Sequence, residues 1–168
     1  ETEKLIQELD ELVLECFNLK DDSFVDYALN IQIPLLVGKE SVYERVDINQ
    51  LRKYADVFLK YFNNILSMNK QYVGVKAYQG MMNHFIALEF IIYDQKPENP
   101  FIIVKENKNT KLELFSKFML NKVNDQFYQI KDVIDFEERS FYILKTDEIK
   151  NWHPAIAKLD LCDVLDSI

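Results

Sequence analysis

The sequence feature that most limits the fold is a long amphipathic segment that begins at Asp47. Its apolar residues recur in steps of three and four, which places them on one face of an α-helix: Ile48, Leu51, Ala55, Phe58, Phe62 and Ile65. Tyr54, Leu59 and Leu66 widen this stripe. Because so broad an apolar face must lie across a core or a partner surface, we predict a helix over Asp47–Met68 with a sheet beneath it.

The segments after this helix have the patterns of β-strands. In residues 71–78, Val73, Val75 and Ala77 alternate with larger or polar residues and Gly74. Residues 84–93 are rich in aromatic and β-branched residues, and residues 101–105 follow a turn that contains two prolines. These three segments predict an antiparallel meander. Residues 127–134 and 140–145 predict a hairpin around Glu137 and Glu138.

Amphipathic helices are predicted in four more segments. Residues 3–18 form the first, and a second begins at the cap Asp21-Asp22-Ser23, runs to about Ile31 and is stopped by Pro34 and Gly38. Helices over 111–123 and 154–168 complete the set. The predicted fold class is α+β, with two layers in which an antiparallel sheet packs against amphipathic helices.

The predicted organisation is an acidic helical segment over residues 1–38, a linker or part of the core, followed by an α+β domain over residues 39–168. Because the chain starts without Met and with a helix already under way, we interpret it as a fragment of a longer protein. The two cysteines fit no disulfide framework and indicate a reducing cytoplasm. The apolar runs are too short for a bilayer span, so we expect no membrane partner.

Charge is distributed unevenly along the chain. The net charge is −8, and residues 1–27 hold nine acidic residues against two lysines, which leaves 18 basic and 19 acidic residues in the rest. A local basic patch is therefore compatible with the acidic total. The strongest such patch is a set of lysines that we list as candidate contacts to duplex DNA, with an ordinary solvated surface as the alternative: Lys105, Lys108, Lys111, Lys117 and Lys122.

The sequence offers few motifs for catalysis. Its three glycines stand apart from one another, so no nucleotide- or S-adenosylmethionine-binding loop is predicted. The two histidines show no catalytic spacing, and we predict neither a catalytic residue nor a metal site from them. One weak alternative is a metal-dependent nuclease, in which Asp94, Glu106 and Lys108 would hold Mg²⁺ and orient a water.

Trp152 and His153 are candidate stacking or partner-contact residues, because they immediately precede a helix that begins at Pro154. The alternative for Trp152 is a place in the core. The first helix also leaves two interpretations. Its apolar residues either pack on this domain or stay partly exposed for a neighbouring domain, and Leu5, Ile6 and Leu9 distinguish the two.

Two short segments resemble a known family. The first, over residues 9–19, reads Leu-Asp-Glu-Leu-Val-Leu-Glu-Cys-Phe-Asn-Leu, with Asn18 where the family has glycine. The second joins Ser-Phe-Tyr-Ile-Leu-Lys over residues 140–145 to Asn-Trp-His-Pro-Ala-Ile-Ala over residues 151–157, with Thr146 where proline is common. They are similar to C-terminal regions of bacterial restriction-modification enzymes of the fused DNA adenine-methyltransferase and endonuclease kind.

The resemblance implies an accessory or DNA target-recognition domain of a restriction-modification or phage-defence DNA methyltransferase. The family's (Asn/Asp)-Pro-Pro-aromatic motif is absent from this sequence, so the segment itself is expected to be non-catalytic and to hold no cofactor. S-adenosylmethionine and Mg²⁺ are expected only in the parent protein, on an upstream catalytic domain. The alternative is a protein-interaction domain of a defence operon that makes no contact with DNA.

Overall fold

The computed structural model describes residues 2–81, 84–104 and 133–167, and it divides the chain into two compact units, residues 1–44 and 45–168. The boundary that we expected from the sequence was at residue 38. Among the described residues, no helix has both the length and the apolar character that crossing a membrane requires.

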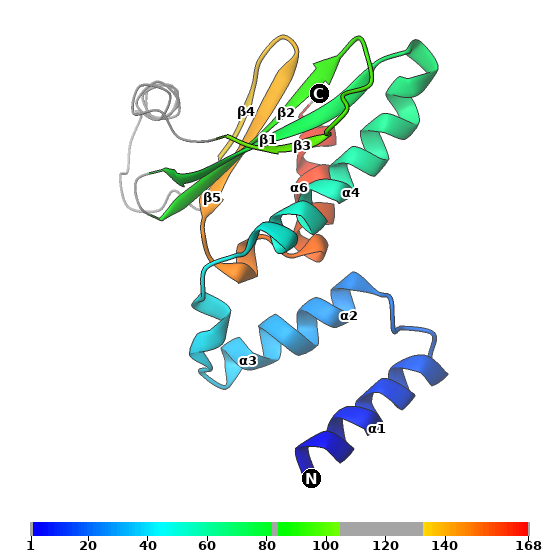
Figure 1. The fold of residues 1–168 in the computed structure, drawn as a ribbon. Helices are drawn as coiled ribbons and strands as arrows, with labels where there is room; N and C mark the ends of the chain where they lie inside the picture. Colours follow the sequence, from blue (N-terminus) through cyan, green and yellow to red (C-terminus); the bar gives the residue numbers. More distant parts are fainter. Residues whose placement is uncertain (1, 82–83, 105–132, 168) are drawn as a thin grey trace. The chain divides into compact units, whose positions relative to one another are not determined.

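The second unit is an α+β domain with two layers. Its elements in chain order are α4 (Ile48–Leu66), η3 (Ser67–Asn69), β1 (Tyr72–Met81), β2 (Phe85–Tyr93), β3 (Phe101–Ile103), β4 (Val133–Phe136), β5 (Ser140–Thr146), η4 (Ile149–Asn151) and α6 (Pro154–Asp166). The strands form one sheet in the order β3-β1-β2-β5-β4, and α4 and α6 pack on one of its faces (Figure 1). The predicted α+β class is confirmed.

The long predicted helix is α4, and a capping box fixes its start. The Asp47 side chain accepts from the Gln50 backbone N–H at 2.8 Å, and the Gln50 side chain accepts from the Asp47 backbone N–H at 2.9 Å. The buried residues of α4 are Leu51, Tyr54, Ala55, Phe58 and Leu59. They contact the inward side chains of the sheet, where the rings of Phe90 and Phe141 stack with their centroids 4.7 Å apart.

The predicted meander is wrong in its third strand. β1 and β2 pair antiparallel from Tyr72↔Tyr93 onwards, but β3 pairs with β1 in parallel, starting at Val75↔Phe101. The physical reason is that β2 already lies between β1 and β5, so β3 cannot pair with β2 and pairs instead with the free edge of β1. The sheet is therefore mixed, although most of its pairs are antiparallel.

Gly74 gives the connection between β2 and β3 its path. A Cβ atom at residue 74 would lie 3.0 Å from Cε2 of Tyr93 and 3.5 Å from both Cγ of Pro97 and the carbonyl oxygen of Pro100. The Val75 N–H then donates to the Pro100 carbonyl at 2.7 Å, which begins the parallel pairing. The missing side chain therefore lets the proline-containing connection pass close to β1.

The β4–β5 hairpin is confirmed where the structure describes it. Phe136 pairs with Phe141, and the Glu137 N–H donates to the Ser140 carbonyl at 2.7 Å, so the turn lies at Glu137 and Glu138 as predicted. Of the predicted strand over 127–134, residues 127–132 lie outside the described residues. The predicted helix over 111–123 lies outside them as well.

The regular elements of the first unit are all helical. It contains α1 (Thr2–Cys16), α2 (Ser23–Tyr27), the π-helical turn η1 (Ala28–Gln32), α3 (Ile33–Leu36) and η2 (Glu40–Tyr43). The Asp22 side chain caps α2 by accepting from the N–H groups of Phe24 and Val25. Among the residues of this unit whose burial is described, Ile31 is the one buried side chain.

The predicted stop at Ile31 is wrong, because the helical run continues through Pro34 to Leu36. In a regular α-helix the ring of Pro34 would clash with the carbonyl of Asn30. Here the Ile33 N–H donates to the Ala28 carbonyl in the wider turn of η1, and Pro34 lies in the first turn of α3, a position that tolerates proline. Gly38 then ends the run at a φ of +73°, as predicted.

Candidate functional site

The most unusual surface of the described structure is the apolar face of α1. It consists of residues at helical spacing that form one stripe: Leu5, Ile6, Leu9, Leu12, Val13 and Cys16. Leu5, Leu9 and Leu12 are 65%, 61% and 59% exposed. Phe17, just beyond the helix, is also exposed. These side chains would gain about 1.5–3 kcal/mol each on full burial, so their exposure points to a surface that receives another apolar surface.

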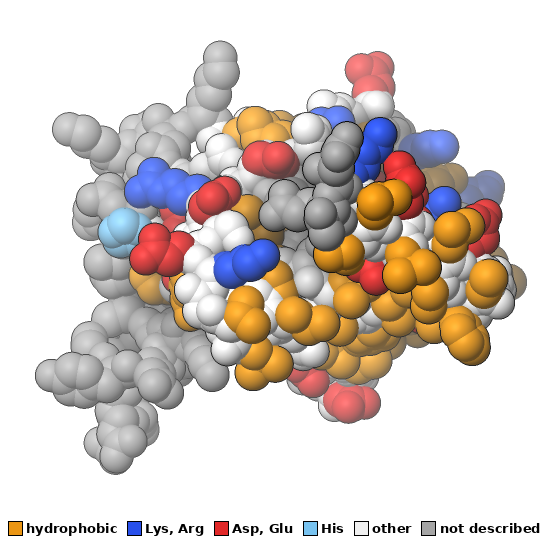
Figure 2. Space-filling view, turned by 90° about the horizontal axis from the view of Figure 1, so that it is seen from below, with side chains coloured by type: hydrophobic (Ala, Val, Ile, Leu, Met, Phe, Trp, Pro, Cys, Tyr) orange, Lys and Arg blue, Asp and Glu red, His pale blue; other side chains and the backbone are white. Residues whose placement is uncertain are grey.

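Further apolar side chains of the same unit are exposed. Besides those of α1, the large exposed ones are Leu19, Phe24, Leu29, Ile33, Leu36, Val37 and Tyr43. The space-filling view in Figure 2 shows exposed hydrophobic side chains with both acidic and basic side chains beside them. The concentration of such residues in residues 1–44 distinguishes this unit from the α+β unit, which holds the main core cluster.

The end of α1 shows how the sequence fixes its length. Asn18 has a φ of 56°, the Asn18 N–H donates to the Glu15 carbonyl, and the Leu19 N–H donates to the Leu14 carbonyl at 2.8 Å. This is the left-handed cap that usually takes glycine and tolerates asparagine. Asn18 therefore adopts the left-handed conformation that favours glycine.

Acidic residues border the apolar face of α1. With a rotation of about 100° per residue, Glu8 and Glu15 lie along one margin of the stripe and Asp10 lies along the other. Lys4 is the one basic residue within α1, and its ammonium lies 3.9 Å from the Glu8 carboxylate with both side chains exposed. Such an exposed pair contributes little stability, so the margins of the stripe keep their acidic character.

The lysines predicted from the sequence as DNA contacts cannot be placed. Lys105, Lys108, Lys111, Lys117 and Lys122 all lie outside the described residues, and so does Glu106 of the nuclease alternative. Asp94, the third residue of that alternative, accepts two hydrogen bonds from the Arg139 guanidinium, at 3.1 and 2.5 Å. These bonds hold the pKa of Asp94 below its ordinary value.

Nowhere in residues 2–81, 84–104 and 133–167 do three or more His, Cys, Asp or Glu side chains gather as a metal site would require.

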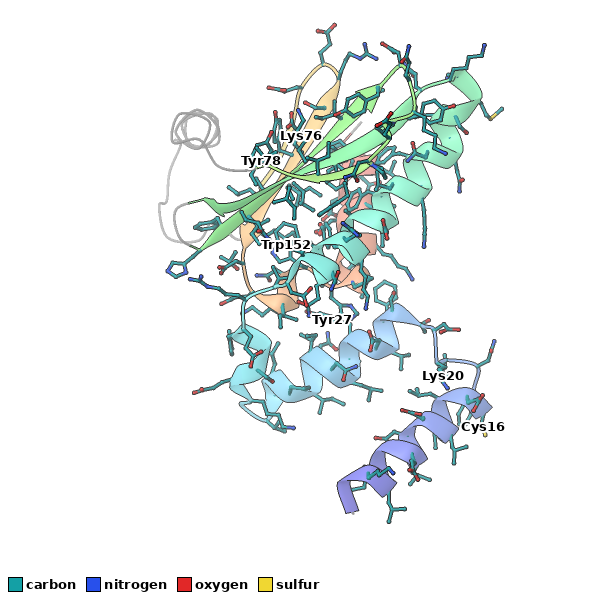
Figure 3. The ribbon with its side chains drawn as sticks, viewed as in Figure 1. Cys16, Lys20, Tyr27, Lys76, Tyr78 and Trp152 are labelled. Carbon is teal, nitrogen blue, oxygen red and sulfur yellow. The ribbon has the colours of Figure 1, made fainter. Side chains whose placement is uncertain are left out.

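Trp152 belongs to the core, so the interpretation of its side chain as an exposed stacking surface is wrong. Its side chain is fully buried against Tyr54, with ring centroids 5.0 Å apart, and its indole N–H donates to the Thr146 carbonyl at 2.8 Å (Figure 3). The interpretation of Trp152 as a core residue is confirmed. His153 caps α6, because its Nδ1 accepts from the Ala155 N–H at 3.2 Å.

Sequence reasoning missed a polar cluster on the sheet face that points away from α4 and α6. The carboxylate of Glu89 on β2 accepts from the Tyr78 hydroxyl at 2.6 Å and from the Tyr142 hydroxyl at 2.8 Å, and the Lys76 ammonium lies 3.9 Å from it. Lys76 and Tyr78 both project from β1 (Figure 3). Burial raises the pKa of both tyrosines, and the hydrogen bonds to Glu89 add to the rise, so both hydroxyls stay donors at neutral pH.

A second missed cluster lies inside the core. The Lys145 ammonium on β5 is 2.6 Å from the Asp160 carboxylate on α6, and the Tyr54 hydroxyl on α4 donates to the same carboxylate oxygen. Lys145 is 1% exposed and Asp160 is 7% exposed. Each of these two clusters joins three elements of the unit, and the charged groups in each have partners within it, so we assign both to the stability of the fold.

Three comparisons with known proteins, against family models, curated proteins and solved structures, gave no match.

Proposed function

We propose that this chain is a protein-interaction module that docks on another protein through the apolar face of α1. The observation that carries the proposal is the exposure of Leu5, Leu9 and Leu12 on a helix of 15 residues. Isolated helices of about 12–15 residues are marginally stable in water, so α1 gains stability when its apolar face is covered. An amphipathic helix laid in an apolar groove is a recurrent mode of protein recognition.

Of the two function classes derived from the sequence, the DNA-contacting one depends on lysines outside the described residues. The interaction class depends on residues that the structure describes. If the module belongs to a bacterial restriction-modification or phage-defence system, as the resemblance implies, its partner would be another protein or domain of that system. The alternative roles, as an accessory or target-recognition domain that contacts DNA, are distinguished by the DNA-binding measurement described below.

The test compares the full chain with the double variant Leu9→Asp/Leu12→Asp, each carrying a proximity-labelling enzyme in its native cells. Burial of each leucine side chain in the complex would contribute about 1.5–3 kcal/mol of binding free energy. Replacing both should therefore lower the affinity for the partner at least tenfold. We expect one set of labelled proteins to disappear in the variant. The matched control is Leu36→Asp, because Leu36 is 86% exposed and lies outside α1.

Labelling that is the same for the wild type and for Leu9→Asp/Leu12→Asp would contradict the proposal. A DNA-binding measurement distinguishes the DNA-contacting function from the protein-interaction function. Binding to duplex DNA that falls steeply with salt and is lost when Lys105, Lys108 and Lys111 are neutralised would favour the DNA-contacting function instead.

A further inference from the structure

We infer that the partner of α1 carries lysine or arginine side chains on both sides of the apolar surface that receives the helix. This inference rests on the proposed function and specifies the chemistry of the partner. It follows from the margins of the stripe, where Glu8 and Glu15 lie on one side and Asp10 on the other. A partner that covered the stripe without basic groups would bring these carboxylates against an apolar or acidic surface, which is unfavourable.

The same charges disfavour the other occupants of this face. Two copies of α1 packed face to face would bring acidic margins together, and the one basic residue of the helix, Lys4, lies beside Glu8 of its own copy. Duplex DNA and anionic lipid surfaces would meet the same repulsion, since residues 1–27 hold nine acidic residues against two lysines. A basic protein surface is the occupant that complements both the apolar stripe and its margins.

The stripe also limits the shape of the partner. Leu5, Leu9, Leu12 and Cys16 follow one another in steps of four, three and four, the spacing by which one helix packs along another. Ile6 and Val13 widen the stripe on one side. Fifteen residues span roughly 22 Å, so the complementary surface is a helix or helical groove of about that length, with basic residues at its flanking positions.

The test uses two synthetic amphipathic helices of equal length, both with leucine at the core positions of each heptad. Helix K carries lysine at the flanking positions and helix E carries glutamate there. The readout is the alkylation rate of Cys16, which is a free, exposed thiol within the stripe at the end of α1 (Figure 3). Cys162 on α6 is also free and exposed, and serves as the internal control in the full chain.

We expect helix K to slow the alkylation of Cys16 severalfold at low salt, to lose part of this effect at high salt, and to leave Cys162 unchanged. Helix E should slow neither thiol. The double variant Glu8→Lys/Glu15→Lys should reverse the preference between the two helices. In the matched control Glu11→Lys the preference should persist, because Glu11 lies on the side of α1 opposite the stripe.

Equal protection of Cys16 by both helices would overturn the basic partner while leaving the docking function standing. Protection by neither helix would also overturn it, and the labelling experiment with Leu9→Asp/Leu12→Asp would still report on docking separately. A Cys16–Cys16 disulfide that forms readily on oxidation would overturn it in favour of a second copy. A further outcome would overturn the docking function: alkylation of Cys16 that is slow in the chain without any added helix and becomes faster in Leu9→Asp. That result would mean that the chain itself covers the stripe.

Discussion

Lys145 and Asp160 place a charged pair inside the core between β5 and α6, where both are almost fully buried. Charges removed from water are costly unless they are paired and hydrogen-bonded, and here Tyr54 completes the arrangement by donating to Asp160. The Lys145 ammonium also lies 5.8 Å from the centre of the Tyr54 ring. The three side chains therefore stabilise the unit only as a complete set.

Replacing one partner should be far more damaging than replacing both. We expect Lys145→Met to lower the free energy of unfolding by about 3–5 kcal/mol, because it leaves the Asp160 carboxylate buried without its cation. The double variant Lys145→Met/Asp160→Leu should lose less than the sum of the two single variants. Denaturant unfolding measures all three.

The control for this prediction is Asp94→Asn, which breaks the exposed ion pair with Arg139. It should change the free energy of unfolding by no more than about 1 kcal/mol. If Lys145→Met were no more destabilising than Asp94→Asn, the buried pair would not contribute as described.

Of this cluster, the strand neighbours of Lys145 could be predicted from the sequence. Once residues 140–145 are identified as a strand, the alternation of side chains places Phe141, Ile143 and Lys145 on the same face. Tyr142 and Leu144 make the other face apolar as well, so the alternation alone does not show which face is the inner one. Asp160 could not be predicted as the partner. Its position relative to Lys145 depends on how α6 lies across the sheet, and residue spacing carries no information about that.

The element order illustrates a similar limit. The sequence predicted α4, β1 and β2 because each has a long repeating pattern of apolar residues. It also predicted the β4–β5 hairpin, because the Glu137-Glu138 turn joins two adjacent antiparallel strands directly. The position of β3 was not readable, because it depends on which sheet edge is free after β5 has paired with β2. Gly74 was the local signal, since an isolated glycine within a strand often marks a close backbone approach.

The close passage of the β2–β3 connection beside β1 leads to a prediction for Gly74. A valine at this position would displace the Tyr93 ring and the Pro97–Pro100 connection, so we expect Gly74→Val to destabilise the unit by about 1–3 kcal/mol. Gly74→Ala should be less harmful in a Tyr93→Ala background than alone, because the closest contact, at 3.0 Å, is with the Tyr93 ring. Thermal unfolding of the four variants checks both statements, and equal effects of Gly74→Ala in the two backgrounds would contradict the second.

At the scale of the whole molecule, burial and exposure are divided between the two units. Every buried residue of the main core cluster lies between Val46 and Val164, within the α+β unit. The helical unit, residues 1–44, instead exposes most of its large apolar side chains. This division is the basis of the proposed docking role of α1, and the spacing of apolar and acidic residues in the first helix was visible in the sequence. Leu5, Ile6 and Leu9 are exposed, and the choice between packing on this domain and serving a neighbouring domain stays a prediction.

The last prediction is that residues 45–168 fold without residues 1–44. Trp152 is the single tryptophan of the chain and is fully buried in the α+β unit, so its fluorescence reports on that unit alone. We expect the deletion to change the free energy of unfolding by less than about 1 kcal/mol, because it removes no residue of the main core cluster. An isolated peptide of residues 1–44 should lose most of its helical signal in circular dichroism, since short helices without a packed face are marginal. A red shift of Trp152 emission on deletion, or a large fall in stability, would instead show that the helical unit covers part of the core.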